Sequence, residues 1–283
     1  MAPEYSGRGD PHTTLALLWG LSAVGRRGRK PALAPEHLGA AAVALADASG
    51  VDGVTMRLLA QRLGVSTMAI YRYVRGKAEL LDLMVECAHG ELPAEPPRGT
   101  VGQRVRCVAE DTWQLYLRHP WLLEVSTYRA ALGPNSLRKY ERELHAVAGA
   151  GLSDLEMDLV AASISDYVRG AARTAVEARA AQRQTGRSDA QWWDTYGEVL
   201  QELIDPGAFP LAVRVGAAAG AEYGAATDPE RAFAFGLQRL IDGIEALVAS
   251  RATAAARKEK AVREGRRTAS RAGQRARKPP STG

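Results

Sequence analysis

Cysteine is nearly absent from this chain of 283 residues, which holds only Cys87 and Cys107 and no Cys-x-x-Cys pair. That scarcity argues against a disulfide scaffold and against a zinc site, because both use several cysteines at regular spacing. Long apolar runs are also missing. The stretch 15–24 is too short to span a bilayer, and its basic cluster follows it, whereas a signal peptide begins with one. We therefore expect a cytoplasmic protein with no membrane partner.

Aromatic residues make up only 6% of the chain, and β-branched runs bounded by turn signals are scarce. Alanine and glycine are plentiful, and the apolar content of 46% suffices for a buried core. This composition favours close-packed helices over sheets. The predicted fold class is all-α.

Positive charge is concentrated at the two ends of the chain. Residues 1–34 carry a net charge of +3, and residues 251–283 hold 11 Lys and Arg against two Glu, a net of +9. The part between them is mildly acidic. Such termini attract nucleic acid or anionic membranes electrostatically, and this attraction is sensitive to salt and does not depend on the base sequence. A solvated tail that only aids solubility fits the same pattern equally well.

Proline and glycine divide the chain into four parts. We predict a basic arm at 1–34 with a possible short helix over 13–24, a small helical unit at 35–91, a larger one at 99–251, and a disordered basic tail at 252–283. The three prolines of 92–99 indicate a hinge between the two units. In the larger unit we expect helices near 100–118, 121–131, 135–149, 154–183, 189–204 and 229–251, with an irregular or partly helical stretch over 206–227.

The small unit contains two short helices joined by a glycine turn. Apolar residues recur at helical spacing from Met56 to Leu63, with Thr55 suited to cap the start and Gly64 the end. Ser66 can cap the next helix, in which Ile70 and Val74 share one face. This arrangement is a helix-turn-helix, whose first helix supports the second so that its outer face enters the major groove.

The side chains left on the outer face suit DNA. A hydroxyl, small apolar groups and an arginine can read base edges, while tyrosines, a lysine and helix N-termini can bind phosphates. The predicted DNA contacts are Thr55, Arg57, Ser66, Thr67, Met68, Ala69, Tyr71, Arg72, Tyr73 and Lys77.

Residues 51–66 (Val-Asp-Gly-Val-Thr-Met-Arg-Leu-Leu-Ala-Gln-Arg-Leu-Gly-Val-Ser), with 69–74 and 76–81, strongly resemble the DNA-binding domain of the tetracycline-repressor (TetR) family. The resemblance covers about 35–90. It implies that Thr55 and Arg57 reach DNA from the second helix, that 67–72 reads bases, and that Tyr71 and Lys77 hold phosphates. Polar residues or proline are common in relatives at positions 56 and 68, which are methionines here, so base preference is not carried over. The basic arm looks like an extension in relatives that adds minor-groove or phosphate contacts.

The C-terminal half resembles the family through 233–237 and 240–247, which look like its closing helix. Phe233, Leu237, Leu240, Ile244 and Leu247 form a near-heptad stripe, which fits an internal core helix or a dimer interface. The resemblance implies that helices near 154–183 and 229–251 pair with those of a second copy.

A ligand pocket would lie between the hinge and this interface, because pockets are commonly lined by aromatic groups and a few polar ones. Each candidate is, by itself, equally suited to the core. The candidates are Trp113, Tyr116, His119, Trp121, Tyr128, Asp166, Tyr167, Trp192 and Trp193. The five histidines lack metal-ligand spacing, so the metal site of the family founder is not carried over and no cofactor is expected.

We expect a homodimeric, sequence-specific repressor that a small molecule releases from a palindromic double-stranded operator. A constitutive DNA-binding protein without an effector is an alternative that the basic tail favours, although about 150 residues of further helical domain would then be unnecessary. An enzyme is disfavoured because the sequence contains no phosphate-binding glycine loop, no His-Glu-x-x-His and no Gly-x-Ser-x-Gly motif.

Overall fold

The computed structural model describes residues 4–5, 7, 9–21, 34–126, 128–129 and 132–276. The described chain is helical apart from two short strands, β1 (Glu4–Tyr5) and β2 (Val125–Ser126), which pair in parallel. The all-α prediction is confirmed. In this part of the chain no helix is both long and apolar enough to cross a membrane.

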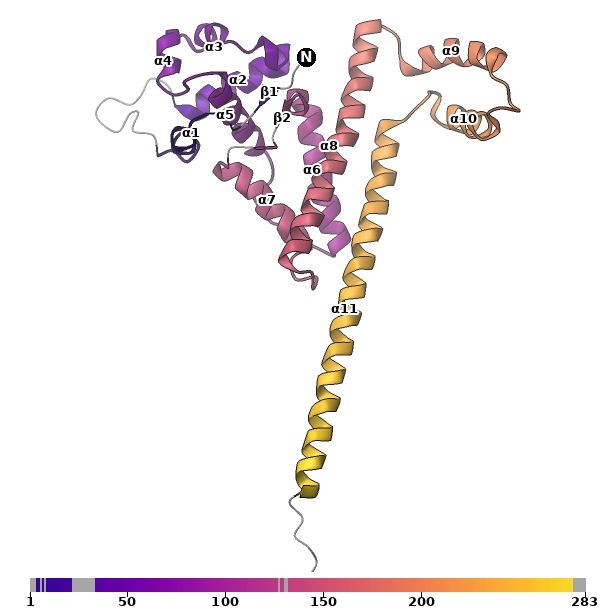
Figure 1. Cartoon of the computed structure of the whole chain (residues 1–283). Helices are drawn as coiled ribbons and strands as arrows, with labels where there is room; N and C mark the ends of the chain where they lie inside the picture. The colour runs from indigo at the N-terminus through magenta and orange to yellow at the C-terminus, as the bar shows by residue number, and fades with distance from the viewer. Residues whose placement is uncertain are drawn as a thin grey trace, which may run out of the picture.

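The small N-terminal unit consists of α2 (Pro35–Ser49), the 3-10 turn Val51–Gly53, α3 (Met56–Leu63), α4 (Thr67–Tyr71) and α5 (Lys77–His89). Its apolar side chains face inward: Leu38 of α2, Leu59 of α3, Ile70 of α4 and Leu80 of α5 are fully buried. The unit forms one end of the molecule (Figure 1).

The larger unit is built on α6 (Val101–Arg118), α7 (Pro134–Val147), α8 (Asp154–Thr185) and the long α11 (Pro229–Ala276). Helices α8 and α11 run side by side in opposite directions, with α6 against both (Figure 1). Their shared core includes Trp113 of α6, whose ring stacks on Phe233 of α11 with centroids 4.0 Å apart.

The N-terminal arm packs across both units. Its helix α1 (Pro11–Leu18) is shorter than the predicted 13–24, whose last residues lie outside the described part. The Gly7 N–H donates to Asp82 of α5 at 2.8 Å, and the Trp19 indole donates to the Leu132 carbonyl at 3.0 Å. The arm thus joins α5 to the segment before α7.

Two predictions of secondary structure are corrected. The helix expected over 121–131 is a 3-10 turn, Pro120–Leu123, followed by β2, because pairing with β1 holds this backbone extended. Helix α10 (Pro210–Tyr223) lies within the stretch 206–227, in agreement with its prediction as partly helical. The tail expected to be disordered from 252 stays helical to Ala276, since Ala, Arg, Lys and Glu favour helices and its first proline is Pro279. Residues 277–283 of that predicted tail lie outside the described part.

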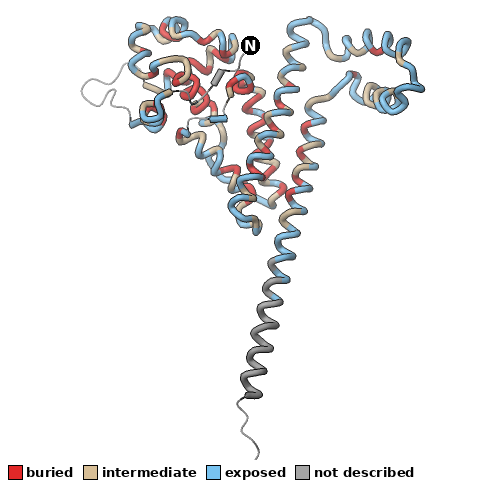
Figure 2. Tube along the Cα trace, viewed as in Figure 1, coloured by how far each residue is buried: buried red, intermediate tan, exposed pale blue. Residues whose placement is uncertain are grey.

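Helices α9 (Asp189–Leu203) and α10 form a hairpin that projects from the ends of α8 and α11 (Figure 1). Figure 2 shows this hairpin almost entirely exposed, and α10 buries none of its residues. Large side chains on it, including Tyr196, Leu203 and Leu211, face solvent.

Candidate DNA-binding surface and ligand cavity

The turn between α3 and α4 has the geometry of a helix-turn-helix. Gly64 ends α3 with φ +66°, a left-handed conformation that glycine adopts without a steric penalty. The Thr55 hydroxyl accepts a hydrogen bond from the Leu58 N–H at 3.2 Å, and the Ser66 hydroxyl accepts one from the Ala69 N–H at 3.2 Å. The predicted caps and glycine turn are confirmed.

Helix α4 is anchored by Ile70 and by Val74 just beyond it, both fully buried against the core that also contains Leu59. The opposite side is open: Met68 is 71% exposed, Tyr71 is 44% exposed, and Arg72 follows as the exposed residue after the helix. Thr67 and Ala69 are half-buried at the start. The predicted base-reading residues therefore lie on a five-residue helix with an open outer face and, in the case of Arg72, directly after it.

Residues predicted to bind phosphate lie around this helix. Thr55 and Arg57 are exposed at the start of α3. Lys77 begins α5 and forms an ion pair with Asp52 at 3.9 Å, while Tyr73 is half-buried. The helix-turn-helix thus presents hydroxyls, cations and two helix N-termini close together. The basic cluster of the arm, residues 26–30, lies outside the described residues.

The two units are tied together at the start of α7. The buried Glu86 carboxylate of α5 accepts hydrogen bonds from the backbone N–H groups of Asn135 and Ser136, the latter at 3.1 Å, so it caps this helix. It also accepts a hydrogen bond from the Ser136 hydroxyl at 2.8 Å. The Nδ1 of His89 lies 3.0 Å from that hydroxyl oxygen and must therefore donate to it. With Nδ1 donating, the neutral form of His89 has Nε2 left as an acceptor.

A second link between the units surrounds His119, at the end of α6. Its Nδ1 lies 2.8 Å from the Asp47 carboxylate of α2, which also accepts the Trp121 indole N–H at 2.9 Å. The Nε2 of His119 lies 3.1 Å from Glu91. Burial alone would raise the pKa of Glu91, but hydrogen bonds from His119 and Arg118 lower it overall. His119 and Trp121, predicted for the pocket, join the two units instead.

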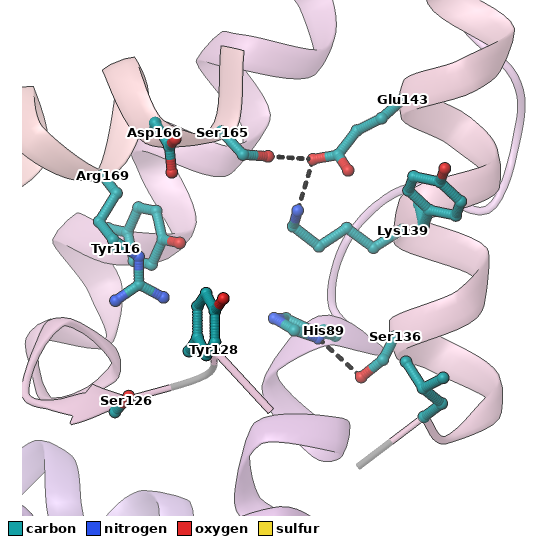
Figure 3. Close-up of a pocket in the computed structure, with 12 residues that line it drawn as sticks. His89, Tyr116, Ser126, Tyr128, Ser136, Lys139, Glu143, Ser165, Asp166 and Arg169 are labelled. Atoms are coloured by element: carbon teal, nitrogen blue, oxygen red, sulfur yellow. Dashed lines mark hydrogen bonds and ion pairs between the residues drawn. The ribbon is translucent and has the colours of Figure 1, made fainter. Parts of the chain in front are cut away.

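A cavity of about 530 Å³ opens between α6, α7, α8 and the residues Ser126, Tyr128 and Leu132, a volume typical of small-molecule sites. Three of the predicted residues line it, namely Tyr116, Tyr128 and Asp166 (Figure 3). The prediction missed its other lining residues, which are His89, Ser126, Leu132, Ser136, Lys139, Tyr140, Glu143, Ser165 and Arg169. Four of these recur at helical spacing along 136–143, a polar face that the sequence does display.

Two of the charged residues in the cavity form an ion pair. Lys139 forms an ion pair with Glu143, which also accepts a hydrogen bond from the Ser165 hydroxyl at 2.9 Å (Figure 3). The Arg169 guanidinium lies over the Tyr116 ring, 5.4 Å from its centroid. Burial, with the nearby charges of Lys139 and Arg169, lowers the pKa of His89 to about 3. The cavity therefore offers aromatic faces, paired charges and one neutral imidazole.

The remaining predicted pocket residues lie elsewhere. Trp113 stacks on Phe233, and the Tyr167 hydroxyl donates to the Phe233 carbonyl at 2.8 Å, so both face α11. Trp192 and Trp193 lie on the projecting α9. Aromatic type alone did not distinguish the core, the hairpin and the cavity.

Comparison with known proteins identifies both units. Residues 38–84 match the model of bacterial regulatory proteins of the tetR family, and residues 92–248 match the tetracyclin repressor-like C-terminal domain. The HTH-type transcriptional repressor DrrR1 of Streptomyces coeruleorubidus is 40% identical over 250 residues, covering 88% of this chain and 90% of the relative. The class A tetracycline repressor protein from transposon 1721 of Escherichia coli is 28% identical, covering 75% of this chain and 90% of that repressor.

Solved structures agree with this result. Apo ActR from Streptomyces coelicolor has a TM-score of 0.63 at 25% identity, covering 79% of this chain and 99% of ActR. ActR in complex with actinorhodin has a TM-score of 0.64 at 25% identity, covering 76% of this chain and 96% of ActR. The models together match most of the chain, and the helix-turn-helix has the required geometry. This chain therefore belongs to the TetR family of DNA-binding, ligand-responsive transcriptional regulators.

Proposed function

We propose that a cytoplasmic homodimer of this chain represses transcription from a palindromic operator and that an aromatic ligand in the α6–α7–α8 cavity releases it. Two copies of α4 would enter successive major grooves, with Arg72 and Met68 at base edges. Thr55, Arg57, Tyr71 and Lys77 would bind the flanking phosphates.

One observation carries the ligand response: His89 and Ser136 both line the cavity and join α5 to α7. A ligand that contacts either residue competes directly with the contact between the two units. Because α5 packs in the same core as α3 and α4, a shift at this contact changes the separation of the two recognition helices in the dimer. The ligand must bind the released state more tightly than the DNA-bound state.

The lining favours an aromatic ligand that carries phenol, carbonyl or carboxyl groups. Tyr116, Tyr128 and Tyr140 offer ring faces, and the Nε2 of His89 can accept a phenol proton. Paired Lys139 and Glu143 offer a donor and an acceptor without a large net charge. The complex of ActR with actinorhodin supports a response of this chain to a small molecule.

Exposed apolar surface supports the homodimer. Leu155 and Leu159 on α8, and Phe235 on α11, are more than half exposed, as is much of the α9–α10 hairpin. Large apolar side chains exposed on both helices are available to a protein interface. We propose that α8 and α11 pair with the same helices of a second copy, which light scattering on the purified protein will test.

The test of the function begins with selection of bound fragments from a random duplex pool. We expect the wild type to enrich a palindrome and the double variant Tyr71→Ala, Arg72→Ala to lose it. Arg183→Ala, which removes an exposed arginine from α8, serves as the matched control. Failure of the wild type to enrich any sequence contradicts operator binding.

The selected operator then measures ligand release, with actinorhodin as the first probe. We expect Tyr128→Ala to require a higher probe concentration for half release, because its exposed ring lines the cavity. Its neighbour Arg129 does not line the cavity, so Arg129→Ala should behave as the wild type. If Tyr128→Ala and Arg129→Ala are released from the operator at the same probe concentration, the assignment of this cavity is contradicted.

A further inference from the structure

Helix α11 continues far beyond the body of the protein. At Arg251 it still contacts α8, through a hydrogen bond of 2.8 Å from its Nε to Glu156. The helical backbone then extends to Ala276, which at 1.5 Å per residue adds about 38 Å. Figure 1 shows this segment as a single helix leaving the domain. We call residues 252–276 the α11 extension.

The α11 extension is strongly basic. It contains eight Lys and Arg against two Glu, a net charge of +6. Several basic positions follow one another at intervals of three or four residues, which places them along one face of the helix. These positions are Lys260, Arg263, Arg267, Arg271 and Arg275.

The composition of the extension excludes two other partners. Its one large apolar residue is Val262. A coiled coil with a second copy needs apolar residues at two positions of every heptad. A helix lying on a membrane needs Leu, Phe or Trp on its buried face. A basic helix without apolar anchors can bind a polyanion through charge alone, as proteins bind the DNA backbone.

The direction of α11 takes this charge away from the recognition helix. Glu156, beside Arg251, is at the start of α8. Seventeen residues later, Arg173 of α8 donates to the Leu123 carbonyl at 2.6 Å, close to the Trp121 contact with the DNA-binding unit. Arg251 is therefore at the end of α8 far from that unit, and the extension continues away from α4 (Figure 1). It does not reach the duplex turn that α4 of its own subunit reads.

We propose that the α11 extension binds the backbone of a second DNA segment, so that a repressor bound at its operator also holds another duplex. The operator-bound form of this inference rests on the proposed function, but the binding of the extension to DNA does not. A dimer would carry two such helices. Binding would be independent of sequence and strongly dependent on salt.

The first experiment measures DNA binding by the extension without an operator. The full-length chain is immobilised through an N-terminal tag and titrated with an operator-free duplex at several salt concentrations. The variant Arg263→Gln, Arg267→Gln, Arg271→Gln removes three charges from one face. The slope of log affinity against log salt concentration changes by roughly 0.9 for each phosphate contact. We therefore expect this slope to be shallower in the variant by about 3 per subunit. The corresponding Arg→Lys variant keeps the charge and should match the wild type.

The second experiment tests the bridge itself. Beads carrying the operator are saturated with protein and washed, and a labelled operator-free duplex is added. We expect the wild type and the Lys variant to capture the label, and the Gln variant to hold the operator equally well but capture at least tenfold less. A protein that never binds the beads contradicts the proposed function at the first step. Equal capture by the Gln variant and the wild type, or no capture by the wild type at low salt, overturns this inference.

Discussion

The capping of α7 by Glu86 permits a quantitative test. Glu86 is 5% exposed and accepts two backbone N–H groups and one hydroxyl, all from the first turn of α7. Replacing it with alanine would leave these three partly buried donors without their acceptor. Gly133 lies directly against the carboxylate, so a methyl group there would displace it.

The expected cost follows from the donors left unpaired. A lost helix cap costs about 0.5–2 kcal/mol, and each buried unsatisfied group about 1–3 kcal/mol. Partial relaxation reduces the sum, so we expect Glu86→Ala to lower the free energy of unfolding by about 3–5 kcal/mol. Glu86→Gln keeps one acceptor oxygen and should lose about 1–2 kcal/mol. The total free energy of unfolding of a protein is commonly about 5–15 kcal/mol, so Glu86→Ala should be severely destabilising, whereas Glu86→Gln should leave the protein folded.

Urea denaturation followed by circular dichroism measures these differences. Glu141→Ala is the matched control, because Glu141 lies on α7, the helix that Glu86 caps, with its side chain 68% exposed. If Glu86→Ala costs less than about 1 kcal/mol, the assignment of this carboxylate as the cap is refuted. In the operator assay, Glu86→Gln should shift the ligand concentration for half release at least fivefold, the lower bound of typical allosteric coupling. An unchanged value would show that this contact does not transmit the ligand signal.

Three further predictions concern the core, the turn and pH. Ile70→Ala should lower the free energy of unfolding by about 2–5 kcal/mol, because Ile70 is fully buried; a loss below about 1 kcal/mol in urea would contradict this packing. Gly64→Ala should lower the free energy of unfolding by about 1–2 kcal/mol, because φ is +66° at this position. Gly197→Ala replaces a glycine in helical conformation and should not lower it. The pKa of His89 is about 3 in the folded protein, whereas a histidine in the unfolded chain has a pKa of about 6.5. Between these values only the unfolded chain takes up the proton, so the free energy of unfolding should decrease by about 1.4 kcal/mol for each pH unit as the pH is lowered from about 6.5 to about 4.5. His89→Asn should remove this dependence in denaturation curves at pH 7 and pH 5, and an equally steep fall in the variant would assign it to other groups.

The sequence by itself determined the helix-turn-helix. Thr55, Gly64 and Ser66 act within one helical turn, and the apolar spacing of Leu59 and Ile70 identifies the buried faces. Such signals are local, so the elements and their exposed sides follow without knowledge of the rest of the fold. The same punctuation by proline and glycine predicts the order of the two units and a hinge between them.

Only the tertiary structure decided which side chains line the cavity and which join the two units. His119 and Trp121 contact Asp47, which is more than 70 residues away in the chain, and Glu86 caps a helix that begins almost 50 residues later. Periodicity gives the face of a helix but not the neighbour that the face meets. The neighbour depends on how α5, α6 and α7 pack together, and this packing brings His89 to the cavity and leaves Trp192 outside it.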